Sequence, residues 1–312
     1  MNRGRYIVHR LALMIPVLFG ITVVVFCLLQ LIPGDPATTI LGIQARPESV
    51  AALRHELGLD RPLWEQYLRY LRNVVTFDLG QSLKYKTSVG SLLPGRLEVT
   101  LALIAYATVL TIAISLPLGI ASALRRDGIF DQVTRAFLMV TLVMPAFWVG
   151  ILFLTFFSIR LQLFPVAGYG DGWQEHLHHL FLPALTIALS IAPLIVRALR
   201  TSILEGLGSD YVRTARAKGL REQAVVTTHV LRNALIPAVT LLGLSVGYLM
   251  GGTVIVENVF SLPGAGKLLV DAIAARDYPL VQSTTLVFAV LVILVNLGTD
   301  VIYTFLDPRV RL

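Results

Sequence analysis

Long apolar runs separated by short polar segments dominate the hydrophobic pattern of this chain of 312 residues. A transmembrane helix needs about 20 mostly apolar residues to cross a hydrocarbon core of about 30 Å. Five runs without Asp, Glu, Lys or Arg reach that length, and they are Leu11–Gly34, Val99–Leu124, Ala136–Ile159, Asn233–Val256 and Tyr278–Thr299. The pattern therefore predicts at least five membrane spans.

A sixth apolar run, Leu180–Val196, is shorter and contains Pro183 and Pro193, so it predicts a span made of a kinked or broken helix. The sequence thus predicts an all-α, polytopic membrane protein with six transmembrane helices in a single domain covering residues 1–312. We place the spans at residues 11–34, 99–124, 136–159, 180–199, 236–256 and 279–305.

The first span resembles a secretory signal, but its apolar run is too long and no A-x-A cleavage site follows it. We interpret it as an uncleaved helix. After it, residues 35–97 form a predicted small helical domain outside the membrane, because apolar and aromatic residues recur there at helical spacing. Asp35 and Pro36 suit the start of a helix, and Gly58 and Pro62 suit breaks between helices.

Composition agrees with a bilayer environment, since 55% of the residues are apolar, 14% are charged and the mean hydropathy is +0.74. The single cysteine, Cys27, excludes an intrachain disulfide. The net charge of +7 has a membrane explanation, because most Lys and Arg outside residues 33–97 fall in alternate, cytoplasmic segments if the N-terminus is inside. We therefore expect both termini in the cytoplasm, and nucleic-acid binding is not needed to explain the charge.

One cytoplasmic loop, residues 203–235, contains the stretch SDYVRTARAKGLREQAVVTTHVLRNALIP. Ser209 or Asp210 can cap a short helix that runs to Lys218, and Gly219 can end it in a left-handed conformation. A second helix from Leu220 would be amphipathic. Its predicted apolar side holds Leu220, Ala224, Val230, Leu231, Ala234 and Leu235, and its predicted polar side holds Arg221, Thr228, His229 and Arg232.

This pair of helices suits three roles, which are a helical pair on anionic lipid, a DNA-binding helix-turn-helix and a docking element for a cytoplasmic partner. Attachment to membrane helices at both ends disfavours entry into a DNA groove. The residues alone leave lipid binding and partner docking open, because both use a basic amphipathic helix.

DYVRTARAKGL followed by RNALIP resembles the cytoplasmic loop of the inner-membrane permease subunits of ABC importers, in the dipeptide, oligopeptide and nickel family. The resemblance covers the whole chain and is closest to the first of that family's two permeases. Further matching motifs occur in order along the sequence, namely LIPGDPA, LGLDRPLWEQYLRYL, FDLGQSL, VFSLPGAGKLL, RDYPLVQ and LDPRVR.

The resemblance implies the type I ABC importer permease fold in the bacterial inner membrane, with an outer loop at residues 257–278 that faces a substrate-delivery protein. It also implies a second, related permease in a heterodimer, two cytoplasmic ATPases and an extracytoplasmic substrate-binding protein as partners, besides membrane lipid. The chain itself would be non-catalytic and without a cofactor, because ATP and magnesium would be used by the ATPases. Transport would proceed by alternating access.

The same resemblance makes the short helix the coupling helix that enters a groove of the ATPase. Its implied docking residues are Asp210, Tyr211, Arg213, Thr214, Ala215, Arg216, Ala217, Lys218 and Gly219. The broader importer motif, E-A-A followed by three residues and Gly, is only partly present. Arg213 occupies the Glu position and Thr214 the first Ala, while Ala215 and Gly219 match.

Two other stretches invite chemical interpretations that we judge weaker. SLPGAGKLL departs from the nucleotide-binding pattern G-x-x-x-x-G-K-[ST], since Ser261 replaces the first Gly and Leu268 the hydroxyl residue. His176, His178 and His179 could ligate zinc or nickel, but histidines in an outer loop are more often interfacial or solvated groups. We expect neither a nucleotide site nor a metal site.

Asp300, near the inner end of the last span, needs water, a partner or a polar pocket, and Arg197 is the partner that we expect.

Three alternatives to a peptide importer stay open. An ion-gradient-driven secondary transporter would usually place ionisable groups near the middle of the membrane. A scaffold without transport activity could use the same loop to recruit a partner. An importer of the same class could carry nickel, glutathione or another small solute.

Overall fold

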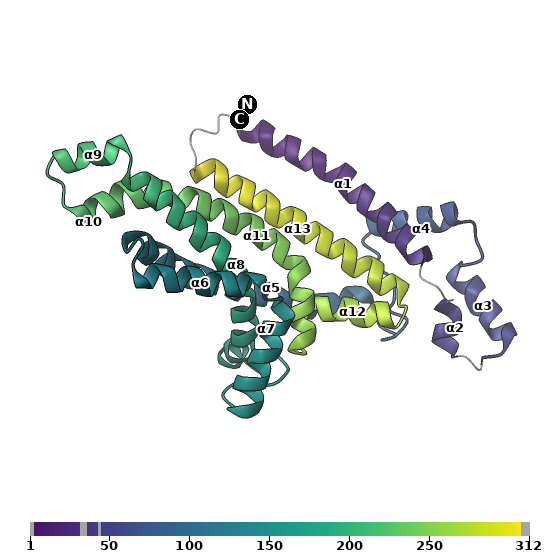
Figure 1. The fold of residues 1–312 in the computed structure, drawn as a ribbon. Helices are drawn as coiled ribbons and strands as arrows, with labels where there is room; N and C mark the ends of the chain where they lie inside the picture. The colour runs from purple at the N-terminus through teal and green to yellow at the C-terminus, as the bar shows by residue number, and fades with distance from the viewer. Residues whose placement is uncertain (1–2, 32–35, 43–44, 307–312) are drawn as a thin grey trace. The chain divides into compact units, whose positions relative to one another are not determined.

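The computed structural model describes residues 3–31, 36–42 and 45–306, most of which are helical (Figure 1). They form two compact units. Of the described residues, those up to residue 100 and residues 263–294 belong to the first unit, and residues 101–262 and 295–306 belong to the second. The helices α5 (Val89–Leu124) and α13 (Tyr278–Leu306) contribute to both units.

In its described residues the first unit contains five helices besides its parts of α5 and α13. They are α1 (Arg3–Leu31), α2 (Pro36–Leu41), α3 (Pro47–Leu57), α4 (Leu63–Val75) and α12 (Ala265–Ala274). The predicted breaks in the outer segment are confirmed, because α3 ends before Gly58, whose φ is +69°, and α4 begins after Pro62. α2 begins at Pro36 as expected, and Asp35 lies outside the described residues.

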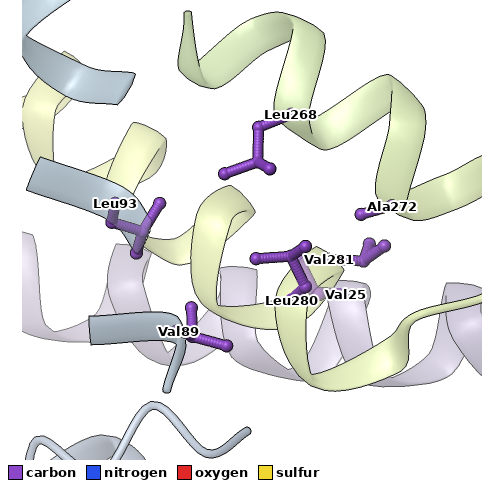
Figure 2. Close-up of a cluster of buried hydrophobic side chains, with 7 residues drawn as sticks. All are labelled: Val25, Val89, Leu93, Leu268, Ala272, Leu280 and Val281. Atoms are coloured by element: carbon purple, nitrogen blue, oxygen red, sulfur yellow. The ribbon is translucent and has the colours of Figure 1, made fainter. Parts of the chain in front are cut away.

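The apolar core of the first unit joins segments that are far apart in the sequence (Figure 2). Val25 of α1 packs with Val89 and Leu93 of α5, and residues of α12 and α13 complete the cluster. Aromatic contacts attach α4 to α1, since the ring centroids of Phe26 and Tyr67 lie 5.3 Å apart. Burying these side chains away from water holds α12 and the start of α13 against the N-terminal helices.

A buried carboxylate connects two of the motifs noted in the sequence. Asp277, from RDYPLVQ, accepts a hydrogen bond from the Ser82 hydroxyl of FDLGQSL at 2.5 Å and one from the Lys84 amide at 3.0 Å. Its other oxygen accepts from the Leu280 amide at 3.3 Å and so caps the start of α13. Asp277 therefore fixes the 78–84 segment to the beginning of the last long helix.

The second unit is built around α8 (Trp173–Leu207). Its other elements are the rest of α5, α6 (Ile129–Val143), α7 (Ala146–Phe153), the π-helix η1 (Leu154–Arg160), α9 (Asp210–Ala217), α10 (Glu222–Ala224), the π-helix η2 (Val225–Val230), α11 (Leu231–Val259) and the end of α13. α8 is continuous over 35 residues although it contains Pro183 and Pro193, so of the two outcomes expected, a kinked or a broken helix, the break is wrong. Membrane helices tolerate proline because neighbouring groups can satisfy the freed carbonyls.

The run Ala136–Ile159, expected as one span, is broken and bent in the structure. α6 ends at Val143, and the pair Ile129–Val143 and Ala146–Arg160 bends by 104°. Met144 is extended, with ψ of 128°, because Pro145 disfavours the helical conformation in the residue before it. The apolar run thus predicts the composition of this segment but not its path.

Four described helices are long and apolar enough to cross a membrane, or five if the bent pair counts as one span. They are Val89–Leu124, Trp173–Leu207, Glu222–Val259 and Tyr278–Gly298. Within α1 the described apolar helix is shorter, Ala12–Leu28. Four to five apolar spans are therefore what the described part of the chain shows.

A buried ion cluster holds the polar link between α5 and α6 to α8. Arg200 of α8 donates from Nε and Nη2 to the two carboxylate oxygens of Asp131, each at 2.8 Å, and Asp131 is fully buried. The Ser122 hydroxyl and the Asp127 amide also donate to this carboxylate. Bidentate geometry and full hydrogen bonding are what a buried carboxylate needs to be tolerated.

Candidate functional site

The stretch after α8 folds into a compact projection, here called the knob (residues 209–230), at the end of α8 and α11 (Figure 1). α9 begins and ends close to the predicted residues, and Gly219 follows it with φ of +76°. The amides of Gly219 and Leu220 donate back to Arg216 and Ala215, at 2.9 and 3.3 Å. A left-handed residue that closes a helix in this way is most readily a glycine.

Ser209 precedes α9 but does not cap it through its side chain. Its hydroxyl instead donates to the carbonyl of Gly206 at 2.5 Å, at the end of α8. The expected side-chain cap is therefore wrong, although the helix starts where the sequence predicts. The first turn carries Asp210, whose negative charge suits the positive end of the helix.

α9 is attached to the knob by one narrow apolar face. Val212 and Ala215, three residues apart, are buried, with 0% and 7% of their surface exposed. Among the nine predicted docking residues Ala215 is thus a packing residue. The other eight, Asp210, Tyr211, Arg213, Thr214, Arg216, Ala217, Lys218 and Gly219, are exposed. They form the free face of α9, together with the exposed Leu220 that follows.

The π-helix η2 supplies the surface on which α9 rests. Val225, Val226 and Val230 are buried, and the buried face continues through Ala234 and Ala238 of α11. The spacing of five residues from Val225 to Val230 is that of a π turn, whereas the next steps of four are those of an α-helix.

The π turn contains one residue more than an α-helical turn, and this extra residue shifts the apolar face of the second helix relative to the α-helical pattern that we expected. Val230 and Ala234 are buried as predicted, but Leu220 is exposed and Val225 and Val226 were missed. The four residues predicted for the polar side, Arg221, Thr228, His229 and Arg232, are all exposed.

Gly206 leaves the room in which α8, α9 and η2 meet. A Cβ built at this position would lie 3.0 Å from Val230 Cγ1 and 3.2 Å from the Tyr211 hydroxyl. Such distances are shorter than ordinary van der Waals contact, so a larger residue would push α9 or η2 away. The orientation of α9 is consequently fixed by packing against the two helices that enter and leave the knob.

An ion pair that the sequence analysis missed closes the Gly219 turn. Arg216 donates from Nε to Glu222 Oε2 at 3.0 Å and from Nη2 to Oε1 at 2.5 Å. The guanidinium of Arg216 lowers the pKa of Glu222 through these hydrogen bonds. Both side chains are about half exposed, so the pair contributes little to the stability of the fold and acts mainly by fixing the geometry of the turn. It joins the last turn of α9 to the start of α10.

The predicted intramembrane pair of Arg197 and Asp300 is not tested by the described side chains. Arg197 is exposed, and the buried guanidinium contact at this end of α8 is made one turn later by Arg200. The backbone of Asp300 belongs to α13, but its side chain lies outside the described residues. Pairing of Arg197 with Asp300 stays a prediction.

Two of the three histidines of DGWQEHLHHLF, His176 and His178, contact backbone atoms of the loop that precedes α8. His176 Nδ1 lies 2.8 Å from the Tyr169 carbonyl oxygen, and His178 Nε2 lies 2.9 Å from that of Leu163. Within the part of the chain that is described, no three His, Cys, Asp or Glu residues gather as a metal site would require. His176 and His178 thus join the loop to α8, whereas Nδ1 of His179 is buried with no hydrogen-bond partner in the described structure.

In SLPGAGKLL, α12 begins at Ala265, and the Ala265 amide donates to the Thr100 hydroxyl at 2.9 Å. Leu262 and Leu268 are buried, so this stretch packs as a turn leading into a helix. An amide bound to a side chain in this way is not free to bind phosphate.

Two family profiles match this chain. Residues 115–312 match the family described as binding-protein-dependent transport system inner membrane component, and residues 3–104 match that of its N-terminal part. The first match begins near the end of α5, continues through all later helices and includes the knob.

Curated relatives match over nearly the full length. The dipeptide transport system permease protein DppB of Escherichia coli (strain K12) is 38% identical, with 98% of each chain covered. A putative peptide permease of Brucella suis biovar 1 is 42% identical over 98% of this chain and 99% of its own. The glutathione transport system permease protein GsiC of Escherichia coli O6:H1 is 40% identical, with 98% of each covered.

Solved structures share the fold at low identity. An inward-facing form of the MetNI methionine ABC transporter gives a TM-score of 0.55 at 19% identity, covering 69% of this chain and 96% of that chain. An amino acid ABC transporter gives a TM-score of 0.51 at 14% identity, covering 71% and 95%. The profile match and the full-length relatives together show that the chain belongs to the family of inner membrane components of binding-protein-dependent transport systems.

Proposed function

We propose that this chain is one of two related permease subunits that form the pore of an ATP-driven importer of di- or oligopeptides. The full-length relatives named for dipeptide and peptide transport support the substrate class. The relative named for glutathione transport makes glutathione, itself a short peptide, the nearest alternative cargo. The chain carries no part of the reaction that supplies the energy, and ATP and magnesium are used by two partner ATPases.

The free face of α9 is the observation that carries this proposal. It projects two arginines, a lysine, Tyr211 and Leu220 from a helix whose opposite side is packed into the knob. A helix that presents aromatic, apolar and cationic side chains on a rigid mount suits a groove in a partner protein. We assign the coupling helix of the importer to α9 and its docking residues to the eight exposed positions.

The packing of α9 in the knob explains how binding of an ATPase to α9 would move the membrane helices. α8 enters the knob and α11 leaves it, and both are long, apolar helices. Because Gly206 leaves no free space beside Val230 and Tyr211, and Val212 of α9 is fully buried, displacement of α9 would be transmitted to these two spans as a rigid body. This is the mechanical requirement of alternating access driven by closure of the ATPases.

We place the chain in the bacterial inner membrane with six spans and both termini in the cytoplasm. α1 and the bent pair α6–α7 supply the two spans beyond the four long apolar helices, and residues 35–97 form a helical domain outside. The distribution of Lys and Arg supports this orientation. The partners are then a second permease, two ATPases inside, a substrate-binding protein outside and the surrounding lipid.

The orientation predicts which cysteines a membrane-impermeant thiol reagent reaches in intact cells. The native Cys27 is exposed and should first be changed to serine. In that background Glu56→Cys, on the exposed side of α3, should be labelled from outside, whereas Gln223→Cys in α10 should be labelled only after permeabilisation. Labelling of Gln223→Cys in sealed cells would invert the proposed topology. Ser82 is unsuitable as an outer probe because it is buried.

Gly219→Val should uncouple the importer. No atom of the described residues lies within 4 Å of a Cβ at this position, so the variant tests the backbone conformation alone. A β-branched residue at φ of +76° costs roughly 1 kcal/mol or more and would re-aim α9. We expect a membrane-inserted complex that loses its ATPases on purification, or keeps them without substrate-stimulated ATP hydrolysis.

Gly208→Ala is the matched control for that experiment. Gly208 also borders α9, but its φ is −85° and an added Cβ would meet only carbonyl oxygens at 3.6 and 3.8 Å. It should couple like the parent. If Gly219→Val also couples like the parent, or if uptake by the parent continues when ATP hydrolysis is blocked, the assignment of α9 or the ATP-driven mechanism is wrong.

Arg216 could act by holding the Gly219 turn or by contacting the ATPase directly, and exchanging its charge with that of Glu222 distinguishes these two roles. Arg216→Glu and Glu222→Arg should each weaken ATPase coupling, because each breaks the pair across the Gly219 turn. If Arg216 acts mainly by holding this turn, the double variant should regain most of the coupling. Arg213, whose only described ionic contact is with the exposed Asp210, offers no such internal rescue.

The measurement is substrate-stimulated ATP hydrolysis by the reconstituted complex for the parent, both single variants and the double variant. A double variant as defective as Arg216→Glu alone would show that Arg216 acts by contacting the ATPase directly.

A further inference from the structure

The first unit contains a cavity of about 210 Å³ that is distinct from the knob. Five segments line it, namely the end of α1, the turn between α3 and α4, α4 itself, residues 78–83 and the start of α13. Phe26, Leu83 and Leu286 contribute apolar walls. The Asp277 contacts described above hold two of the five segments together, so the cavity is part of the folded unit.

Two charged side chains of the lining, Arg69 and Asp78, are both exposed and are available to a ligand. Arg69 has no carboxylate partner among the described residues, and its Nη1 lies 2.8 Å from the place where a Cβ on Gly58 would be. Gly58 thus leaves space for this guanidinium. Arg61 also lines the cavity but is paired with Glu65, at 2.5 Å. Asp78 uses one carboxylate oxygen to accept the Gly80 amide at 3.0 Å, which leaves the other oxygen open.

The remaining polar groups suit uncharged hydrogen bonding. Tyr70 lines the cavity, and its hydroxyl is buried with no hydrogen-bond partner in the described structure. Burial raises the pKa of Tyr70 to about 12, so the group stays a neutral hydroxyl. A buried hydroxyl without a partner is costly, and a ligand that bonds to it removes that cost. The amides of Asn73 and Gln282 lie in the same lining.

We propose that this cavity is a peptide-binding site of the permease itself, which holds a dipeptide with both termini free. Arg69 binds the terminal carboxylate, Asp78 faces the terminal ammonium group, and the apolar walls take the side chains. One available cation and one available anion match a zwitterion better than a ligand with net charge. The choice of a peptide as the zwitterion rests on the proposed function.

Size narrows the ligand further. Sites for drug-sized molecules have volumes of roughly 300–1,000 Å³, so 210 Å³ suits a dipeptide and is too small to enclose a whole phospholipid. A site of this kind on the proposed outer side would receive peptide before it enters the pore. It would add selection for free termini to whatever selection the binding protein makes.

Binding of dialanine to the purified complex, without its binding protein, tests the site by isothermal titration calorimetry. The parent should bind dialanine, and dialanine amide and N-acetyl-dialanine should each bind about tenfold more weakly, since each loses one charge-assisted hydrogen bond. Arg69→Gln should abolish the difference between dialanine and its amide, and Asp78→Asn should abolish the difference between dialanine and its acetylated form.

Arg72→Gln is the matched control, because Arg72 is an exposed arginine on the same helix that does not line the cavity. It should bind all three ligands as the parent does. The proposal is overturned if the parent does not bind dialanine, if Arg69→Gln retains the discrimination against the amide, or if native mass spectrometry finds a phospholipid that only Arg69→Gln releases.

Uptake measurements on the same variants keep this site separate from the proposed function. ATP-dependent import of dialanine that is unchanged in Arg69→Gln and Asp78→Asn would leave the importer assignment standing and refute a role for the cavity. Binding that depends on Arg69, in a parent complex that imports no peptide with ATP, would leave the cavity standing and refute the importer assignment.

Discussion

The packing of α9 against the π-helix η2 is the constraint on which the rest of the account depends. Val212 and Ala215 bury a face only two residues wide, and Gly206 lets α8 approach close enough to complete the contact. A helix of eight residues has little stability of its own in water, so its position must come from tertiary contacts. These contacts make the exposed face a fixed surface, and fixed surfaces are what a two-state movement between subunits requires.

Electrostatics refines this arrangement without supporting it alone. The Arg216–Glu222 pair spans the glycine turn at the tip of the knob, where solvent weakens it. The Asp131–Arg200 pair joins α6 to α8 within the second unit, and its carboxylate is fully buried and fully hydrogen-bonded. The first pair sets the angle between α9 and α10, and the second ties the α5–α6 link to the helix that leads into the knob.

Much of the helical architecture could be predicted from the sequence, because a bilayer forces apolar helices of a minimum length. The start of α9, its end at Gly219 and the breaks at Gly58 and Pro62 follow from local backbone preferences, and they were predicted correctly. The bend after Met144 was missed since the apolar run continues through Pro145. The π turns were missed because their extra residue is chosen by packing and has no local signature.

The contacts that build the functional regions were harder to predict from the sequence. Asp131 and Arg200 are separated by 69 residues and Ser82 and Asp277 by 195, so no local pattern joins them. The motifs FDLGQSL and RDYPLVQ contributed only to the family resemblance, and the structure shows that the two segments bind each other. The Arg216–Glu222 pair could have been found, since opposite charges lie on either side of a predicted glycine turn.

The central claim, that the free face of α9 docks a cytoplasmic ATPase, is tested most directly by photo-cross-linking in intact membranes. A photoreactive amino acid at Thr214, exposed on α9, should form an adduct with the ATPase subunit, whereas one at Thr228, exposed on η2, should form far less. Adducts of Thr214 with lipid alone, in a complex that still contains its ATPases, would contradict the account and make α9 a helix that lies on the membrane surface.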